Sequence, residues 1–155
     1  MTTFFFLQED YDALQKAIGG VEKMIGGILK DMGAGMQDGA DTWHDNFDYD
    51  EGQRQSAMYS DRIRGLIQIK NNAQVITPKP FNGRVLIGRV VTIQDMDNQE
   101  IRKFQIGSFL ILGEHREAIS YMSPLAKILL GGRMGEIKTG VIGKTNKKFK
   151  IINIE

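Results

Sequence analysis

The chain has 155 residues, of which 41% are apolar and 25% are charged, and its net charge is +1. This composition is ordinary for a folded globular protein and excludes the intrinsically disordered class. Cysteine is absent, so disulfides, thiolate catalysis and cysteine-based metal sites are excluded. No apolar stretch approaches the ~18 residues of a membrane-spanning helix, and the apolar run at residues 4–7 is too short for a signal peptide. We therefore expect a cytoplasmic protein.

Charge is distributed unevenly along the chain. Residues 1–75 carry 12 acidic and 7 basic side chains, a net charge of −5, whereas residues 76–155 carry 7 acidic and 13 basic side chains, a net charge of +6. Such asymmetry indicates two surfaces with different partners. It predicts a boundary near residue 76, with an N-terminal domain at residues 1–77 and a C-terminal domain at residues 78–155.

The N-terminal half predicts two helices that pair with each other. Seven residues recur at alternating spacings of three and four and so form one stripe of a helix: Tyr11, Leu14, Ile18, Val21, Ile25, Ile28 and Met32. A second helix is expected over residues 47–73, with a comparable stripe of Tyr59, Ile63, Leu66 and Ala73 and with Ile67 and Ile69 beside it. Because one stripe needs a partner and the neighbouring segment is nearest, we expect an antiparallel coiled-coil hairpin.

Glycines interrupt the first of these helices. Gly19, Gly20, Gly26 and Gly27 each cost about 0.5 to 1 kcal/mol relative to alanine in a helix interior. Two interpretations stay open: the glycines allow close approach of another helix, or they mark a flexible stalk.

The turn between the two predicted helices is strongly acidic. Residues 36–51 contain no lysine or arginine and six carboxylates: Asp38, Asp41, Asp45, Asp48, Asp50 and Glu51. These charges repel one another, so they either disperse in water or meet a cation or a basic partner. A solvated acidic turn is the simpler interpretation, and a metal-binding or partner-binding tip is the functional one.

The C-terminal half predicts a small α+β domain. Residues 77–83 contain two prolines and a glycine and are expected to be a linker. Strands are expected at residues 84–93, 100–106, 109–112 and 118–122, and an antiparallel pair at 136–142 and 148–154, with Asn146 in its turn. Ser123 before Pro124 is typical of a helix cap, which predicts a helix over residues 125–130 that stops at Gly131 and Gly132.

Four segments resemble the bacterial Gre family of transcript cleavage factors. They are residues 7–18 (LQEDYDALQKAI), 72–76 (NAQVI), 83–95 (GRVLIGRVVTIQD) and 119–137 (ISYMSPLAKILLGGRMGEI). The resemblance covers nearly all of the chain in the same order, and the serine-proline-leucine helix with its glycine-rich exit is its most specific part. The resemblance implies an antiparallel coiled-coil hairpin followed by a small FKBP-like β-sheet domain with one short helix.

The resemblance also implies a function. Gre factors dock their C-terminal domain at the rim of the RNA polymerase secondary channel, and the coiled coil enters the channel. The acidic tip then helps to hold a second Mg²⁺ at the polymerase active site, which speeds hydrolysis of the backtracked transcript. We therefore expect a monomeric accessory factor, with no cofactor of its own, that contacts the RNA 3′ end and DNA only through polymerase.

The family's acidic tip can be carried over residue by residue. The second half of its pattern matches Asp45, Asn46, Asp48 and Tyr49. Asp45 takes the place of a glutamate, and Asp41 is the counterpart of the leading aspartate. One residue is inserted around Trp43 and His44, so Asp41 lies four positions before Asp45 instead of three. The resemblance implies Asp41 and Asp45 as the Mg²⁺-holding, catalytic carboxylates.

The partner-binding residues implied by the resemblance are Met122, Ser123, Pro124 and Leu125, which correspond to the segment that contacts the polymerase rim. For Ser123 and Pro124 the alternative is a purely structural role as helix cap and first helical residue.

Histidines and lysines have both functional and structural interpretations. His44 is a candidate proton shuttle or metal ligand, but a packing or capping role beside Trp43 is the alternative. His115 is expected in a solvated charged turn. Four lysines form a basic set that attracts an acidic surface or nucleic acid, or that protects an edge strand: Lys144, Lys147, Lys148 and Lys150.

Two further functions remain alternatives. Some relatives occupy the channel without stimulating cleavage, and the altered tip makes such an inhibitor the second hypothesis. The third is a peptidyl-prolyl isomerase, which needs an aromatic-lined pocket. The C-terminal half offers only five aromatic residues for that role: Phe81, Phe104, Phe109, Tyr121 and Phe149.

Overall fold

The computed structural model describes residues 2–37, 46–113 and 117–155. The chain divides into two compact units. One unit is Asp12–Asn72, and the other combines Met1–Tyr11 with Ala73–Glu155. No helix among the described residues has the length and apolar character needed to cross a membrane.

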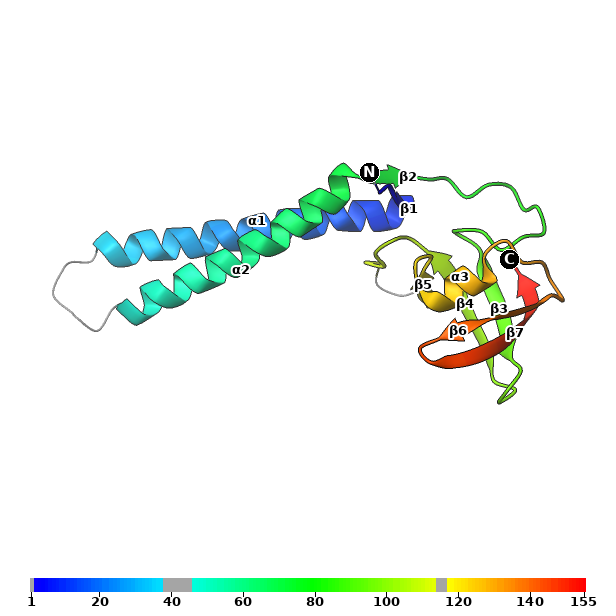
Figure 1. The fold of residues 1–155 in the computed structure, drawn as a ribbon. Helices are drawn as coiled ribbons and strands as arrows, with labels where there is room; N and C mark the ends of the chain where they lie inside the picture. Colours follow the sequence, from blue (N-terminus) through cyan, green and yellow to red (C-terminus); the bar gives the residue numbers. More distant parts are fainter. Residues whose placement is uncertain (1, 38–45, 114–116) are drawn as a thin grey trace. The chain divides into compact units, whose positions relative to one another are not determined.

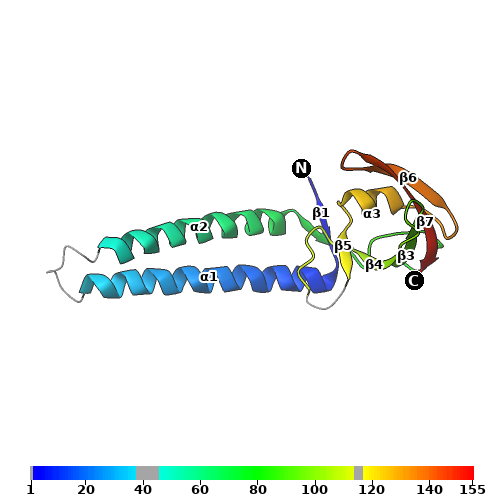
Figure 2. The ribbon, with the colours of Figure 1, turned by 90° about the horizontal axis from the view of Figure 1, so that it is seen from below.

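The first unit is a hairpin of two helices. Helix α1 (Gln8–Gln37) and helix α2 (Asn46–Asn71) lie side by side and antiparallel in both views of the ribbon (Figures 1 and 2). The predicted stripe on α1 is confirmed, because Leu14, Ile18 and Val21 are buried. On α2 the stripe residues Tyr59, Ile63 and Leu66 are partly buried. The predicted helical hairpin is therefore present.

Helix α2 ends at Asn71, two residues earlier than predicted. The Asn72 side chain donates to the Gln68 carbonyl over 2.8 Å, and the Asn72 backbone N–H donates to the Ile69 carbonyl. Ala73 then enters strand β2 (Ala73–Val75). The periodic pattern placed Ala73 on the helical stripe because hydrophobic periodicity carries no information about pairing with a distant strand.

The two glycine pairs in the middle of α1 have open surroundings. A Cβ added at Gly19, Gly20, Gly26 or Gly27 would meet no atom within 4 Å. The interpretation that these glycines allow another helix of the chain to approach closely is therefore wrong. The contrasting position is Gly52 of α2, where a Cβ would lie 2.8 Å from Met32 Cγ.

The second unit contains a mixed five-stranded sheet in the order β5-β4-β3-β7-β6. Its strands are β3 (Val90–Asp95), β4 (Ile101–Gly107), β5 (Ala118–Ser120), β6 (Ile137–Ile142) and β7 (Thr145–Ile154). Strand β3 is antiparallel to β4 and β7, β6 is antiparallel to β7, and β5 is parallel to β4. The short helix α3 (Pro124–Leu129) follows β5. The predicted α+β fold class is confirmed.

The core of this unit lies where β3, β4 and β7 meet α3. Its buried residues are Val85, Val91, Ile93, Phe104, Ile106, Ala126, Leu129, Phe149, Ile151 and Ile154. Alternate residues of β3 are buried, as are Phe149 and Ile151 of β7, which is expected for strands with one face in a core.

Three local predictions for this unit are wrong. Residues 84–89 are not part of a strand: Arg89 donates its backbone N–H to the Leu86 carbonyl, and Gly88 has a φ of 92°, so the chain turns before β3 begins. Residues 109–112 are not a strand either. Strand β7 begins at Thr145, so Asn146 lies in the strand, because Gly143, with a φ of 65°, permits a tighter turn.

The N-terminal residues add a second sheet to this unit. Strand β1 (Phe4–Phe6) pairs in parallel with β2, with Phe4 opposite Ala73. The ring centroids of Phe4 and Phe109 are 4.2 Å apart, and the Tyr121 hydroxyl accepts the Phe5 backbone N–H over 3.2 Å. These contacts hold β1 against the segment that follows β4.

Candidate functional site

The predicted metal-holding residues Asp41 and Asp45 lie outside the described residues, as do Trp43 and His44. By sequence they belong to the eight-residue connection between α1 and α2. Among the residues that the structure describes, no group of three or more histidine, aspartate or glutamate side chains is placed to hold a metal ion. His115 also falls outside the described part of the chain.

The first described acids after the connection lie at the start of α2. Asp50 is exposed, and Glu51 accepts a hydrogen bond from the Gln55 side chain over 3.1 Å, one helical turn later. Side-chain pairs four residues apart lie on one face of a helix and stabilise it modestly. Part of the acidic run therefore supports α2 itself.

The predicted partner-binding segment begins α3. Ser123 is the N-cap, and its side chain accepts the Ala126 backbone N–H over 3.2 Å. Pro124 occupies the first helical turn, where its missing N–H is no loss. Both local predictions are confirmed.

The four residues of this segment face different surroundings. Met122 is 42% exposed, and Pro124, two residues later in the sequence, is also exposed. Leu125 packs against the core of the sheet. Met122 and Pro124 are thus the members available to a partner, whereas Ser123 and Leu125 fix the helix that carries them.

Glycines let the end of α3 pack tightly. Gly131 has a φ of 76° and donates its backbone N–H to the Val85 carbonyl. A Cβ at Gly132 would lie 2.6 Å from Ile151 Cδ1. The glycine-rich exit is therefore required by the left-handed turn and by close contact with β7.

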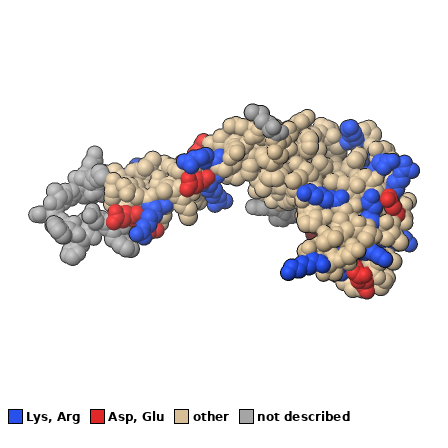
Figure 3. Space-filling model, in the orientation of Figure 1, with Lys and Arg blue, Asp and Glu red and all other residues tan. Residues whose placement is uncertain are grey.

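The lysines of β7 and its turn have separate roles. Lys147 lies 3.3 Å from Asp95 and from Asp97. The backbone N–H of Asp97, followed by the Lys147 ammonium, lowers the pKa of Asp95, and the two carboxylates raise the pKa of Lys147. Lys144, Lys148 and Lys150 are exposed. Basic side chains are spread over this face of the sheet unit in Figure 3.

A buried polar cluster was not predicted from the sequence. Asp10 and Ser108 are fully buried, and the Ser108 hydroxyl donates to the Asp10 carboxylate. Asp10 also accepts the backbone N–H groups of Leu112 and Gly113 over 3.3 and 3.4 Å, and Ser108 accepts the Leu7 N–H over 2.8 Å. The cluster fixes the segment after β4 to the first turn of α1. No local pattern marks Asp10, because its partners lie about a hundred residues away.

The aromatic residues considered for an isomerase pocket do not converge. Phe104 and Phe149 are buried in the core. Phe81 is 57% exposed, with the Arg89 guanidinium 5.2 Å from its ring centroid. Phe109 and Tyr121 pack with the aromatic residues of β1. This distribution gives no support to the isomerase hypothesis.

The chain thus combines a two-helix hairpin, whose helices are joined in the sequence by an acid-rich connection, with a small sheet unit that carries a capped surface helix. A family model described as "Transcription elongation factor, GreA/GreB, C-term" matches residues 79–155. Transcription elongation factor GreA of Paracoccus denitrificans is 31% identical over 110 residues, which is 71% of this chain and 70% of that protein. The GreA of Mesomycoplasma hyopneumoniae strain 7448 is 31% identical over 112 residues, which is 72% and 68% of the two chains. The chain belongs to the GreA/GreB family of transcription elongation factors.

Two solved structures are also similar. GreA factor homolog 1 (Gfh1) of Thermus thermophilus is 21% identical, covers 99% of both chains and has a TM-score of 0.45. The GreA/GreB factor of Nitrosomonas europaea is 13% identical, covers 99% of this chain and 98% of its own, and has a TM-score of 0.39. Neither likeness bears on function.

Proposed function

We propose that the chain is an accessory factor of RNA polymerase that inserts its helical hairpin into the secondary channel and stimulates cleavage of backtracked transcripts. The observation that carries this proposal is the acidic connection at the end of a two-helix hairpin in a GreA/GreB family member. The chain itself is not the hydrolase. It supplies carboxylates to the active site of polymerase.

Asp41 and Asp45 are the residues to which we assign this role. A carboxylate at the tip of the hairpin offers the oxygen ligands that Mg²⁺ prefers beside phosphate and water. In a two-metal site, the second ion stabilises the attacking and leaving oxygens of phosphodiester hydrolysis. The role of the hairpin is to present these carboxylates, and that of the sheet unit is to hold the factor on polymerase.

For docking at the channel rim we assign the segment Met122, Ser123, Pro124 and Leu125. The exposure of Met122 and Pro124 supports contact with a partner, and the cap made by Ser123 supports a rigid presentation of that contact. Pro124→Ala with unchanged thermal stability should weaken competition against wild-type protein for polymerase.

The test uses halted, backtracked elongation complexes, in which the release of short 3′ RNA fragments is measured at fixed Mg²⁺. Asp45→Ala should slow release at least about tenfold, which corresponds to about 1.4 kcal/mol of transition-state stabilisation, while polymerase binding is retained. Asp41→Ala should act in the same direction. The matched control is Asp61→Ala, which removes an exposed aspartate elsewhere on the hairpin. Wild-type cleavage rates in Asp45→Ala would reject the assignment of Asp45.

The second candidate is a channel-occupying inhibitor, and the extra residue between Asp41 and Asp45 favours it. In that case the wild-type protein slows nucleotide addition and releases no 3′ fragments. Deleting Trp43 restores the family spacing and should then create cleavage activity. Robust cleavage by the wild-type protein would eliminate this candidate.

A further inference from the structure

Strand β6 forms an open edge of the five-stranded sheet. It is six residues long and contains no proline. Ile137 is 52% exposed and Val141 is 62% exposed on this strand. Natural proteins usually protect sheet edges with charges, prolines or bulges, because an unprotected edge is a template for another strand. Lys138 is the one charged residue of this strand, and because β6 has neither proline nor a bulge, it keeps a continuous run of backbone groups to which another strand can be added.

The backbone of β6 presents unpaired hydrogen-bonding groups at this edge. Ile142 pairs with Thr145 across a two-residue turn, and such a turn is closed by a hydrogen-bonded pair. Because hydrogen-bonded pairs alternate in an antiparallel ladder, every second residue of β6 bonds to β7. The same phase holds beyond the strand, where Glu136 accepts the Ile151 N–H over 2.9 Å. The residues whose N–H and C=O groups point to the open edge are Ile137, Thr139 and Val141.

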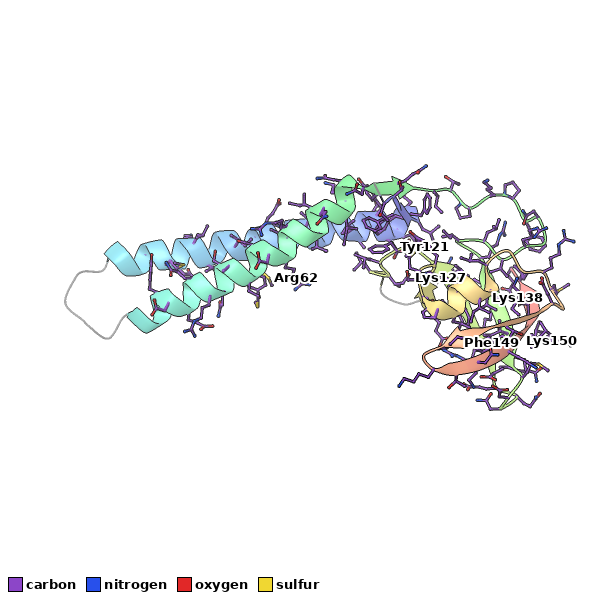
Figure 4. The ribbon with its side chains drawn as sticks, viewed as in Figure 1. Arg62, Tyr121, Lys127, Lys138, Phe149 and Lys150 are labelled. Carbon is purple, nitrogen blue, oxygen red and sulfur yellow. The ribbon has the colours of Figure 1, made fainter. Side chains whose placement is uncertain are left out.

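Helix α3 lies close to this edge, and a groove runs between α3 and β6. A Cβ at Gly140 would lie 2.4 Å from Ile128 Cγ1, so the absence of a side chain on β6 admits the helix. The groove is lined by Pro124, Lys127, Ile128, Glu136, Ile137, Lys138, Thr139 and Val141. Lys127 and Lys138 come from the two sides of this groove, α3 and β6 (Figure 4). A groove between a helix and an edge strand suits an extended peptide.

The groove and the strand behind it are basic. Besides Lys127 and Lys138, exposed Lys148 and Lys150 of β7 lie directly opposite Thr139 and Ile137. The acidic member of the lining is Glu136, 3.5 Å from Lys138. A second copy of β6 would bring these lysines against one another, which is unfavourable. Charge complementarity instead favours an acidic segment.

We propose that the β6 edge binds an extended segment of a partner protein in which acidic and apolar side chains alternate, and that this segment adds a strand to the sheet beside α3. Backbone hydrogen bonds to residues 137–141 give the affinity, and the lysines select an acidic sequence. The groove shares Pro124 with the segment proposed to dock on polymerase, but the strand addition requires neither the hairpin tip nor Mg²⁺ and so goes beyond the function proposed above.

The test uses the full chain labelled with ¹⁵N and an eight-residue peptide of alternating glutamate and valine with blocked ends. The amide signals of Ile137, Thr139 and Val141 should shift and become protected from exchange. Thr139→Pro removes one N–H at the centre of the edge, where proline is tolerated because no sheet bond is lost. It should weaken binding at least about tenfold, whereas Thr139→Val should change binding less than about twofold.

Two further probes keep the test independent of how well the proline variant folds. Peptides N-methylated on one or the other alternate set of residues should differ at least about tenfold in affinity, because only one set faces β6. The same peptide with lysine in place of glutamate should bind at least about tenfold more weakly. Equal affinity for the two methylated peptides, shifts confined to other strands, or dimerisation of the chain through β6 would overturn the proposal.

Discussion

Replacing the glycines in the middle of α1 with alanine should stabilise the helical hairpin. A Cβ at Gly19, Gly20, Gly26 or Gly27 would meet no atom within 4 Å, so the substitution introduces no clash. Alanine restricts the unfolded chain and is favoured over glycine by about 0.5 to 1 kcal/mol at each interior helical position. The quadruple variant should therefore gain about 2 to 4 kcal/mol in the free energy of unfolding of the hairpin.

The assay is thermal unfolding followed by circular dichroism at a helix-sensitive wavelength. For a unit of this size, each 1 kcal/mol moves the midpoint by about 4 to 8 °C, so the helical transition should rise by roughly 10 to 30 °C. Gly52→Ala is the matched control, because its Cβ would lie 2.8 Å from Met32 Cγ and 3.0 Å from Met32 Sδ. That variant should gain less than any single α1 variant.

A lowered midpoint for the quadruple variant would refute the reasoning, since it would mean that these glycines contact another surface closely. The same variant also tests the flexible-stalk interpretation. If flexibility of α1 is needed on polymerase, transcript cleavage should fall although stability rises. Full cleavage activity in a stabilised variant would leave the glycines without that role.

Two further predictions concern the sheet unit. Hydrogen bonds lower the pKa of Asp95 below its ordinary value of 3.8. The ionised carboxylate therefore stabilises the fold above that pH, and this contribution is lost as the pH falls through the lowered pKa. Asp95→Asn should flatten the acid branch of the curve of urea midpoint against pH, and parallel curves for the variant and the wild-type protein would contradict this. Gly140→Val places a Cβ 2.4 Å from Ile128 Cγ1 and should cost about 1 to 3 kcal/mol of unfolding free energy by overpacking, whereas Thr139→Val at the neighbouring exposed position should change it by less than about 0.5 kcal/mol.

Local signals in the sequence were sufficient for the elements that depend on neighbouring residues. The stripe on α1 was predictable because helical periodicity places Leu14, Ile18 and Val21 on one face. Helix α3 was predictable because Ser123 and Pro124 satisfy the requirements of a helix start within a few residues. The sequence was therefore sufficient to place Ser123 and Pro124 at the start of a helix.

Long-range pairings were beyond such signals. Strands β1 and β2 pair with each other although both helices of the hairpin separate them in the sequence. Neither three-residue strand is long enough to show the alternation of apolar and polar residues that marks a strand. The burial of Asp10 depends on Ser108 and on the backbone after it, and nothing adjacent to Asp10 reports these partners. The predicted strand over residues 84–93 missed the turn at Gly88 because this segment is rich in strand-forming residues. The positive φ of Gly88 is a property of the folded backbone, and residue composition does not reveal it.

The positive charge of the sheet unit is only partly used inside the fold. Lys147 is committed to Asp95 and Asp97, and Lys103 to Glu155 over 2.8 Å. Lys127, Lys148 and Lys150 are exposed and stand outside these ion pairs. Attraction between exposed charges is screened beyond about 8 Å at physiological ionic strength. These lysines therefore attract only acidic groups that come within that distance of the sheet. Part of the positive charge of the C-terminal half therefore lies on α3 and β7 near the β6 edge, where the proposed acidic strand would meet it.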